Sequence, residues 1–339
     1  MDTSVKNLRV SRRHSAKVGP RFEPPARPGL GSRAIRGATH LANIIGGLTR
    51  VARSVLPTPR GESPDRWRRG REQARRLARC DAVVVSYGKS GRTWLRVMLS
   101  YYLQRAHDLP EGELLSLNNY QRCNGAAPSI DFTHDNYLLH YTDQPNDRRD
   151  HDDKRVVLMV RQPQDVAISQ YHHWRHRRRS DLKRMDNYPA DGSELSLFEF
   201  VCQPRGGLPR IIEWMNEWAA ETPHVRDLHG VRPEDLKRSP TDEFFAVADF
   251  LLGSADPALA GESVQFGDVG SMRKLEQTGF FGVRGRNPMR ARDPATPDSA
   301  KVRQARAGGY REDFGDAPQR ELDTYVGENL DPVFGYSTC

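Results

Sequence analysis

The stretch VVVSYGKSGRTWL, residues 83–95, decides the fold class of this chain. The β-branched residues at 83–85 predict a buried strand, and the strand pattern stops at Gly88. Apolar residues then recur at helical spacing from Trp94 onward, so the stretch predicts a strand, a tight glycine loop and a helix. Such a loop points backbone N–H groups and the positive end of a helix at an anion, and Lys89 adds a point charge. We interpret the loop as a phosphate-binding cradle.

The loop differs from that of a standard nucleoside triphosphatase. The Walker A pattern needs an earlier glycine, separated by four residues from the Gly-Lys-Ser/Thr triplet. Gly88-Lys89-Ser90 supplies the triplet, but the earlier position is Val83, inside the expected strand. A different class of phosphate-containing ligand is therefore favoured.

The basic charge of the chain is concentrated at its N-terminal end. The first 79 of the 339 residues hold nineteen Lys or Arg and five Asp or Glu, whereas the whole chain has a formal net charge of +8. The remainder is net acidic, so the charge of the whole chain is no argument for nucleic-acid binding, and we expect no specific nucleic-acid partner. Residues 1–70 are rich in Arg, Pro and Gly, and we expect a mostly disordered basic arm that touches anionic surfaces weakly. The apolar spacing of 41–56 allows one short helix within this arm.

The four cysteines are scattered, without Cys-x-x-Cys spacing, and this pattern suits a reducing compartment. No apolar run reaches the roughly 18 residues of a membrane span. The start of the chain has no apolar segment typical of a secretory signal. We therefore expect a cytoplasmic protein.

A second strand is followed by a second set of anion-binding side chains. The run VVLMV at 156–160 is continuously apolar, as in a strand buried on both faces of a parallel sheet, and it ends at Arg161. Ser169 lies two turns into the helix that follows. Ligands bind at the carboxyl ends of strands in such sheets, so Arg161 and Ser169 are candidates for a second phosphate site. The repeated strand-turn-helix pattern predicts an α/β domain at 71–339, after a linker at 57–70 and an opening helix at 71–79.

The two segments resemble the paired nucleotide-binding motifs of the cytosolic-type sulfotransferase family, which uses 3′-phosphoadenylyl sulfate (PAPS). Residues 87–94, YGKSGRTW, are similar to the family's Tyr-Pro-Lys-Ser-Gly-Thr-Thr-Trp loop. Residues 160–169, VRQPQDVAIS, are similar to its Val-Arg-(Asp/Asn)-Pro-x-Asp-x-x-x-Ser segment. The resemblance spans roughly residues 78–335. It implies a three-layer, P-loop NTPase-like fold and direct in-line transfer of a sulfuryl group to a hydroxyl or amine of a small-molecule or glycan acceptor.

The resemblance implies a role for each matching residue. Lys89 would contact the sulfuryl group and the leaving 5′-phosphate and neutralise charge as the bond breaks. Arg161 and Ser169 would bind the 3′-phosphate, together with Arg303, which lies in a segment similar to the family's Arg-Lys-Gly. Trp94 would stack on the adenine. The other implied contacts are Ser90, Gly91, Arg92 and Thr93 with the 5′-phosphosulfate, and Phe266 and Met272 beside the adenine.

The general base implied by the resemblance is a histidine in a Thr-His pair between the two motifs, and histidine suits proton removal near neutral pH. His134, in Phe132-Thr133-His134, matches this pair by order and type. His140 is the competing candidate and His107 a weaker one. The pair His172-His173 looks like metal ligands, but neighbouring residues on a helix do not present both rings to one ion. We expect no metal.

Five positions depart from the family pattern. Gly88 replaces a proline, and Arg92 replaces a threonine. The others are Phe132 in place of a lysine found in many members, Pro233 in place of an adenine-side tyrosine, and Ala305 in place of a glycine. These departures leave a catalytically degenerate nucleotide-binding protein, tethered by its basic arm, as an open alternative.

A P-loop kinase-like phosphotransferase is the second alternative. It needs a Mg²⁺-binding acid at the end of a strand, where this chain has Arg161. The basic run at 172–179 has two interpretations, a solvated helix face or a patch that steers an acidic acceptor such as a charged glycan.

Overall fold

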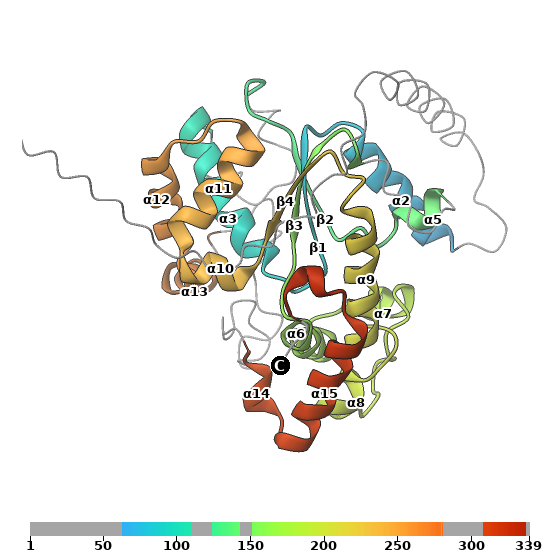
Figure 1. Cartoon of the computed structure of the whole chain (residues 1–339). Helices are drawn as coiled ribbons and strands as arrows, with labels where there is room; N and C mark the ends of the chain where they lie inside the picture. Colours follow the sequence, from blue (N-terminus) through green and yellow to red (C-terminus); the bar gives the residue numbers. More distant parts are fainter. Residues whose placement is uncertain (1–62, 110–123, 143–150, 279, 281–307, 337–339) are drawn as a thin grey trace, which may run out of the picture.

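A parallel β-sheet forms the centre of the computed structural model, which describes residues 63–109, 124–142, 151–278, 280 and 308–336. Within these ranges four strands pair in the order β2-β1-β3-β4 (Figure 1). Each neighbouring pair is parallel. The strands are β1 (Ala82–Ser86), β2 (Ile130–Thr133), β3 (Arg155–Met159) and β4 (Asp227–Val231).

The two central strands form where the sequence predicts them. All five residues of β1 are buried, and four of the five in β3 are. Their β-branched side chains alternate between two helix layers: Val83 and Val85 belong to one hydrophobic core, and Val84 to the other. The sheet is therefore covered on both faces, and the three-layer α/β prediction is confirmed.

Helices cover the two faces of the sheet, as Figure 1 shows on either side of the strands. The layer packed on Val83 and Val85 draws on α2 (Pro64–Leu77), α5 (Leu138–Thr142), α6 (Pro163–His176), α8 (Leu197–Val201), α9 (Leu208–Glu221), α14 (Tyr310–Asp313), α15 (Asp316–Asn329) and the short helix η4 (Pro332–Phe334). The layer packed on Val84 draws on α3 (Arg92–His107), α10 (Pro233–Arg238), α11 (Pro240–Leu252) and α12 (Pro257–Phe266). Two further helices, α7 (Ser180–Met185) and α13 (Val269–Gln277), lie beside these layers.

The sequence pattern does not predict strand β2. It carries polar side chains at buried positions, so its pattern is not that of a buried strand. Asp131 is fully buried, and Arg76 of α2 donates to both of its carboxylate oxygens at 3.3 Å. An ion pair with a helix that is distant in the sequence thus allows a charged residue to lie inside the strand.

The linker prediction for 57–70 is wrong from Pro64 onward, because α2 begins there and not at Arg71. Trp67 packs edge-to-face on Tyr141 of α5, with ring centroids 5.6 Å apart. Arg66 donates from Nε to the Met185 carbonyl at 2.6 Å. The helix is rich in arginine and has little apolar surface, so its docking face is not evident from the sequence.

Several sequence predictions fall outside the described residues. They concern the arm over residues 1–62, including the helix at 41–56, and the segment at 281–307, which holds Arg303 and Ala305. In the described ranges no single helix is long and apolar enough to cross a membrane; α11 and α12, bent by 117°, meet that test only as a pair.

Replacing Gly70 with alanine is expected to destabilise the protein, although alanine is the better helix former. A Cβ at Gly70 would lie 2.2 Å from the Tyr137 carbonyl oxygen and 2.8 Å from Tyr141 Cβ, so backbone must move. We expect Gly70→Ala to lower the free energy of unfolding by about 1–3 kcal/mol, the usual cost of overpacking. Urea unfolding measures it.

The matched control is Gly261→Ala in α12, where a Cβ meets nothing within 4 Å. That change should stabilise the protein by roughly 0.5–1 kcal/mol. If both variants were stabilised alike, the close contact between α2 and the Tyr137–Tyr141 segment would be wrong.

Candidate active site

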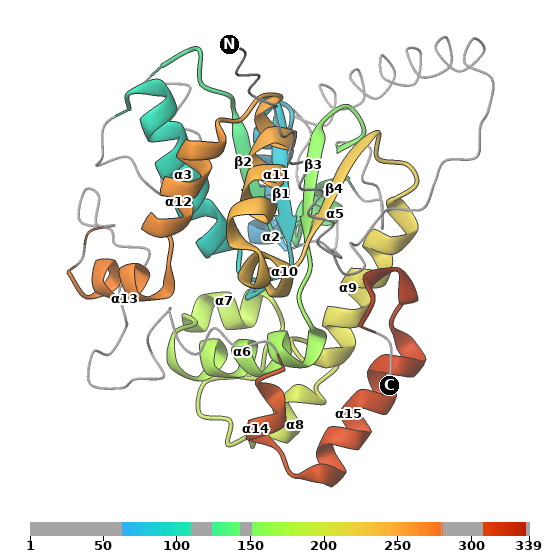
Figure 2. The ribbon, with the colours of Figure 1, turned by 60° about the vertical axis from the view of Figure 1, so that its left-hand side comes forward.

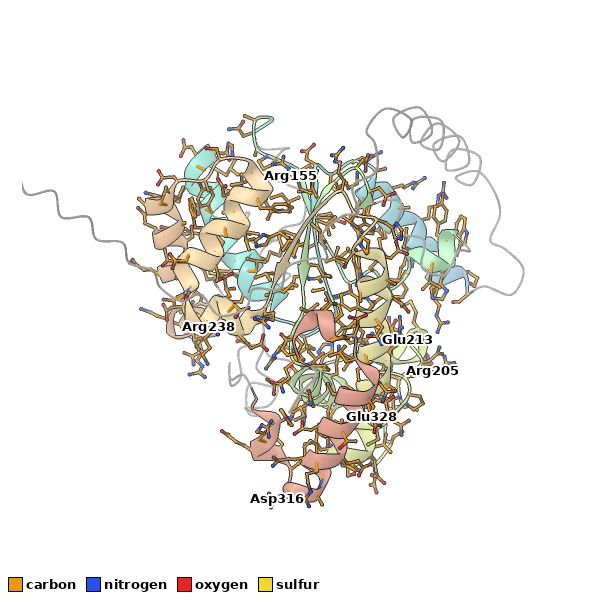
Figure 3. All side chains as sticks on the ribbon, in the orientation of Figure 1. Arg155, Arg205, Glu213, Arg238, Asp316 and Glu328 are labelled. Atoms are coloured by element: carbon orange, nitrogen blue, oxygen red, sulfur yellow. The ribbon has the colours of Figure 1, made fainter. Side chains whose placement is uncertain are left out.

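A cleft of about 1070 Å³ opens at the carboxyl ends of the strands. The helices that follow β3 and β4, α6 and α10, lie at the same end of the sheet (Figure 2). Another part of the cleft wall comes from α5, α7, α9 and the segment between α8 and α9, and Figure 3 labels Arg205 of that segment and Glu213 of α9. Eight of the predicted site residues line the cleft: Lys89, Gly91, Arg92, Thr93, Trp94, His134, Arg161 and Ser169. Ser90 is buried beneath the loop, and Arg303 lies outside the described residues.

The loop after β1 turns sharply through two residues in the left-handed region. Lys89 has φ 77° and Gly91 has φ 89°, and Gly91 is the N-cap of α3. The positive φ of Gly91 favours glycine, and a Cβ there would lie 3.1 Å from Pro233 Cγ and 3.2 Å from Met159 Cε, so these side chains would have to shift slightly. The first turn of α3 contains no acidic residue. The N–H groups at the start of α3 are therefore suited to bind an anion in the cleft.

Gly88 occupies the position where the family resemblance expects a proline. Gln170 of α6 donates from Nε2 to the Gly88 carbonyl at 3.0 Å. A Cβ at Gly88 would lie only 2.8 Å from the same nitrogen. The amide of Gln170 thus fills the space that a proline ring would need, and it also ties the loop to α6.

Arg161 connects the second strand-helix unit to the first. It donates from Nη1 to the Lys89 carbonyl at 3.4 Å and from Nη2 to the Asp165 carboxylate at 3.2 Å. Asp165 also accepts from the backbone N–H groups of Gly308 and Tyr310, at 2.9 and 3.0 Å. This carboxylate therefore holds Arg161 and the returning C-terminal segment together, beside Ser169 in the cleft wall.

Trp94 is held by a hydrogen bond from Nε1 to the Gly267 carbonyl at 2.6 Å. One side of its indole packs on the core of the α3 layer, and Met272 of α13 joins it in the cleft wall. Phe266, the other residue matched to the adenine side, stacks on Tyr101 at 4.4 Å and is outside the cleft lining. Pro233 lines the cleft where the family has a tyrosine.

His134 lies directly after β2, and both of its ring nitrogens are engaged. Nδ1 is 2.8 Å from the Ser86 carbonyl, and Nε2 is 2.8 Å from Nη2 of Arg92. A carbonyl only accepts and a guanidinium only donates, so the proton is on Nδ1 and the lone pair of Nε2 accepts from Arg92. Burial, followed by the charge of Arg92, lowers the pKa of His134 well below its ordinary value, against the opposing hydrogen bond to Ser86. The ring is a neutral base at neutral pH.

The structure distinguishes the competing histidines in part. His107 is the last residue of α3, at the end of the helix away from the Lys89 loop, and it is outside the cleft lining. His140 of α5 does line the cleft, so it stays a competitor by position. The neighbours His172 and His173 also line it, and no three His, Cys, Asp or Glu side chains of the described ranges gather as metal ligands would.

The basic run at 172–179 divides between the cleft and the surface. Arg178 lines the cleft, forms an ion pair with Asp186 and lies 4.5 Å from the centre of the Tyr188 ring. Arg179 is an exposed partner of Asp181. The run thus lies partly in the cleft and partly on the surface, and the steering of an acidic acceptor stays a prediction.

Part of the cleft wall is not predicted from the sequence. Tyr87 and Tyr188 line it, and burial raises the pKa of both phenols, so both keep their protons. Tyr87 stands edge-to-face on Trp214 at 5.7 Å. Tyr87 opens the glycine-loop motif, but no local motif marks Tyr188, and the two residues lie on segments that meet only in three dimensions.

The His134→Gln variant is expected to lose part of the acid sensitivity of the fold. Glutamine can donate to Ser86 and accept from Arg92 without titrating. The unfolded chain binds a proton at histidine near pH 6.5, whereas native His134 does not, so wild-type stability falls as pH drops below about 6.5. Urea unfolding from pH 8 to 5 should show a shallower fall in the variant; identical pH profiles would contradict the lowered pKa.

Comparison with known families supplies one match along the sequence. A family model described as "Sulfotransferase domain" matches residues 79–333. No curated protein sequence matches the chain.

Solved structures that resemble the chain include three complexes with PAP. Retinol dehydratase with androsterone and inactive cofactor PAP shares 17% identity at a TM-score of 0.47, covering 74% of this chain and 80% of that one. Retinol dehydratase with retinol and PAP shares 18% at 0.48, covering 74% and 81%. A mouse sulfotransferase complexed with PAP shares 14% at 0.46, covering 76% and 87%.

Proposed function

Since the chain belongs to the sulfotransferase family, we propose that it transfers a sulfuryl group from 3′-phosphoadenylyl sulfate to a hydroxyl or amine acceptor. The observation that carries this proposal is the convergence in one cleft of the Lys89 loop, the Arg161–Ser169 unit and His134. Such a transfer needs positively charged side chains that bind the two anionic groups of the donor, and an uncharged base that can accept a proton.

The donor set fits a nucleotide phosphorylated at two places. Lys89, Ser90, Gly91, Arg92 and Thr93 would hold the 5′-phosphosulfate at the start of α3, where N–H groups and positive charge converge. At the other site, Arg161 and Ser169, with Arg303, would hold the 3′-phosphate. Trp94 would stack on the adenine, its ring orientation set by the bond to Gly267. When bound, the donor supplies an activated sulfuryl group and a bisphosphate leaving group.

His134 is proposed as the general base and Lys89 as the electrostatic catalyst. Nε2 of His134 takes the acceptor proton as the acceptor oxygen or nitrogen forms its bond to sulfur. Lys89 stabilises the electron pair that remains on the 5′-phosphate oxygen as the old sulfur–oxygen bond breaks. Because both bonds change in one in-line displacement, no covalent enzyme intermediate is proposed.

The finer points of partner and location belong to the same proposal. The acceptor is a small molecule or glycan bound against the wall that contains Tyr87 and Tyr188. The chain acts in the cytoplasm, and its basic arm makes weak contacts with anionic surfaces.

Adenosine 3′,5′-bisphosphate, the expected product, should bind the wild-type chain without added Mg²⁺. We expect Lys89→Ala and Arg161→Ala each to weaken binding roughly 10- to 100-fold, since each removes a charge-assisted hydrogen bond. Isothermal titration calorimetry measures this, with Arg226→Ala as the matched control. Arg226 is exposed and bonds Asp227, away from the cleft. Absence of wild-type binding at high micromolar nucleotide would refute the donor assignment.

The variant His134→Ala should retain bisphosphate binding and lose transfer by about 100-fold or more, the usual contribution of a general base. Sulfur-labelled donor, screened against hydroxyl and amine acceptors, measures transfer and identifies the acceptor class. His140→Ala is the matched control from the same cleft and should keep its activity. Loss in His140→Ala alone would move the base to His140, and transfer of labelled phosphate from ATP would favour the kinase alternative.

A further inference from the structure

The nitrogen that must accept the proton is occupied by an arginine of the donor site. Nη2 of Arg92 lies 2.8 Å from Nε2 of His134 and donates into its lone pair. While this bond persists, Nε2 cannot take a proton from an acceptor, because an imidazole nitrogen has a single lone pair. The base as observed is therefore correctly oriented by Ser86 and blocked by Arg92.

Arg92 is poorly satisfied where it lies. Its Nη1 is inaccessible to solvent and has no hydrogen-bond partner among the described protein atoms. Burial, then the neighbouring charge of Arg96, lowers the pKa of Arg92 to about 9, with Asp131 opposing and Arg76 adding to the effect. It is also the first residue of α3, where the helix dipole disfavours a cation and favours an anion. An anion at this point would relieve each of these costs.

The charges around His134 also single out Arg92. The charges that face its ring come from Arg92, Arg178 and His173, and the Ser86 carbonyl accepts from the other nitrogen. Arg178 already has Asp186 as an ion-pair partner. Of the guanidinium groups near the ring, Arg92 is the one that contacts it and also lies in the loop that receives the donor.

We propose that Arg92 is a positioning residue that blocks His134 until the 5′-phosphosulfate of the donor draws its guanidinium away. This inference rests on the proposed function and concerns the regulation of the same site. Donor binding exchanges one acceptor of Arg92, the imidazole, for another, the anionic oxygens at the start of α3. Nε2 is released by the same exchange. The donor therefore binds before a productive acceptor, and Arg92 replaces the family threonine with a group that couples the two steps.

The first test is the titration of His134 by NMR with labelled histidine, its signal assigned from the His134→Gln spectrum. We expect the pKa of His134 to be higher in ligand-free Arg92→Thr than in the wild type by about one unit or more. Binding of bisphosphate should raise the pKa of His134 by a larger amount in the wild type than in Arg92→Thr. Only the wild type has an Arg92–His134 contact that binding can break. Equal ligand-free pKa values, or equal shifts on binding, would overturn the proposal.

The second test uses thermodynamic reciprocity. If the nucleotide must break the Arg92–His134 bond, then removing that bond in advance should tighten nucleotide binding. We expect His134→Ala to bind bisphosphate several-fold more tightly than the wild type, and the same change to have no effect in the Arg92→Thr background. If the effects of Arg92→Thr and His134→Ala on the free energy of bisphosphate binding are additive in this double-mutant cycle, the proposed coupling between Arg92 and His134 is wrong.

Controls separate the possible failures. Arg96→Gln removes a charge one turn along α3, over the Phe132 ring, and should leave the titration of His134 unchanged. Arg92→Gln keeps a hydrogen-bond donor but removes the charge, and it replaces Arg92→Thr in the test if that variant does not fold. The pKa of His134 in Arg92→Gln should lie between the values in the wild type and in Arg92→Thr. If the wild type binds no bisphosphate, the proposed function fails. The ligand-free comparison still decides whether Arg92 engages His134.

Discussion

Ser86, Met159 and Val231 end three neighbouring strands at one level, because β1, β3 and β4 pair in parallel and in register. The gathering of the residues that follow these strands in one cleft depends on this alignment. The Lys89 loop, Arg161 and Pro233 each come within a few residues of a strand end, so the sheet delivers them to one edge. Strand β2 adds His134 from the other side of β1, since Thr133 pairs with Val85. A change of register would separate the base from the anion site.

Two of the cations that line the cleft are held in place by carboxylates. Arg161 is paired with Asp165, which also fixes the backbone at Gly308 and Tyr310. Arg210 of α9 is paired with Glu217 at 3.0 Å. Paired cations lose little side-chain freedom when an anion arrives, so binding energy is not spent on ordering them. Arg92 is the contrast, because its partner is an uncharged imidazole.

The departures from the family pattern have structural counterparts. Gly88 makes room for the Gln170 amide, which ties the loop to α6 in place of a rigid proline. Pro233 packs against Gly91, the residue whose positive φ starts α3. Arg92 contacts the base itself. The loop between β1 and α3 is therefore supported by side chains from α6 and α10 and linked to His134, in a way that a motif alone does not reveal.

The sequence by itself determined the two buried strands, the loop between β1 and α3, and the pairing of Lys89 with Arg161 and Ser169 in one site. These follow from local patterns: β-branched runs, glycine positions and helical spacing each act over a few residues. Only the tertiary structure decided that β2 is a strand, since its buried Asp131 depends on Arg76 of a distant helix. It also decided that α2 belongs to the fold and that Arg92 occupies Nε2 of His134. Such contacts join residues far apart in the chain, and they depend on sheet register and packing, which local patterns do not encode.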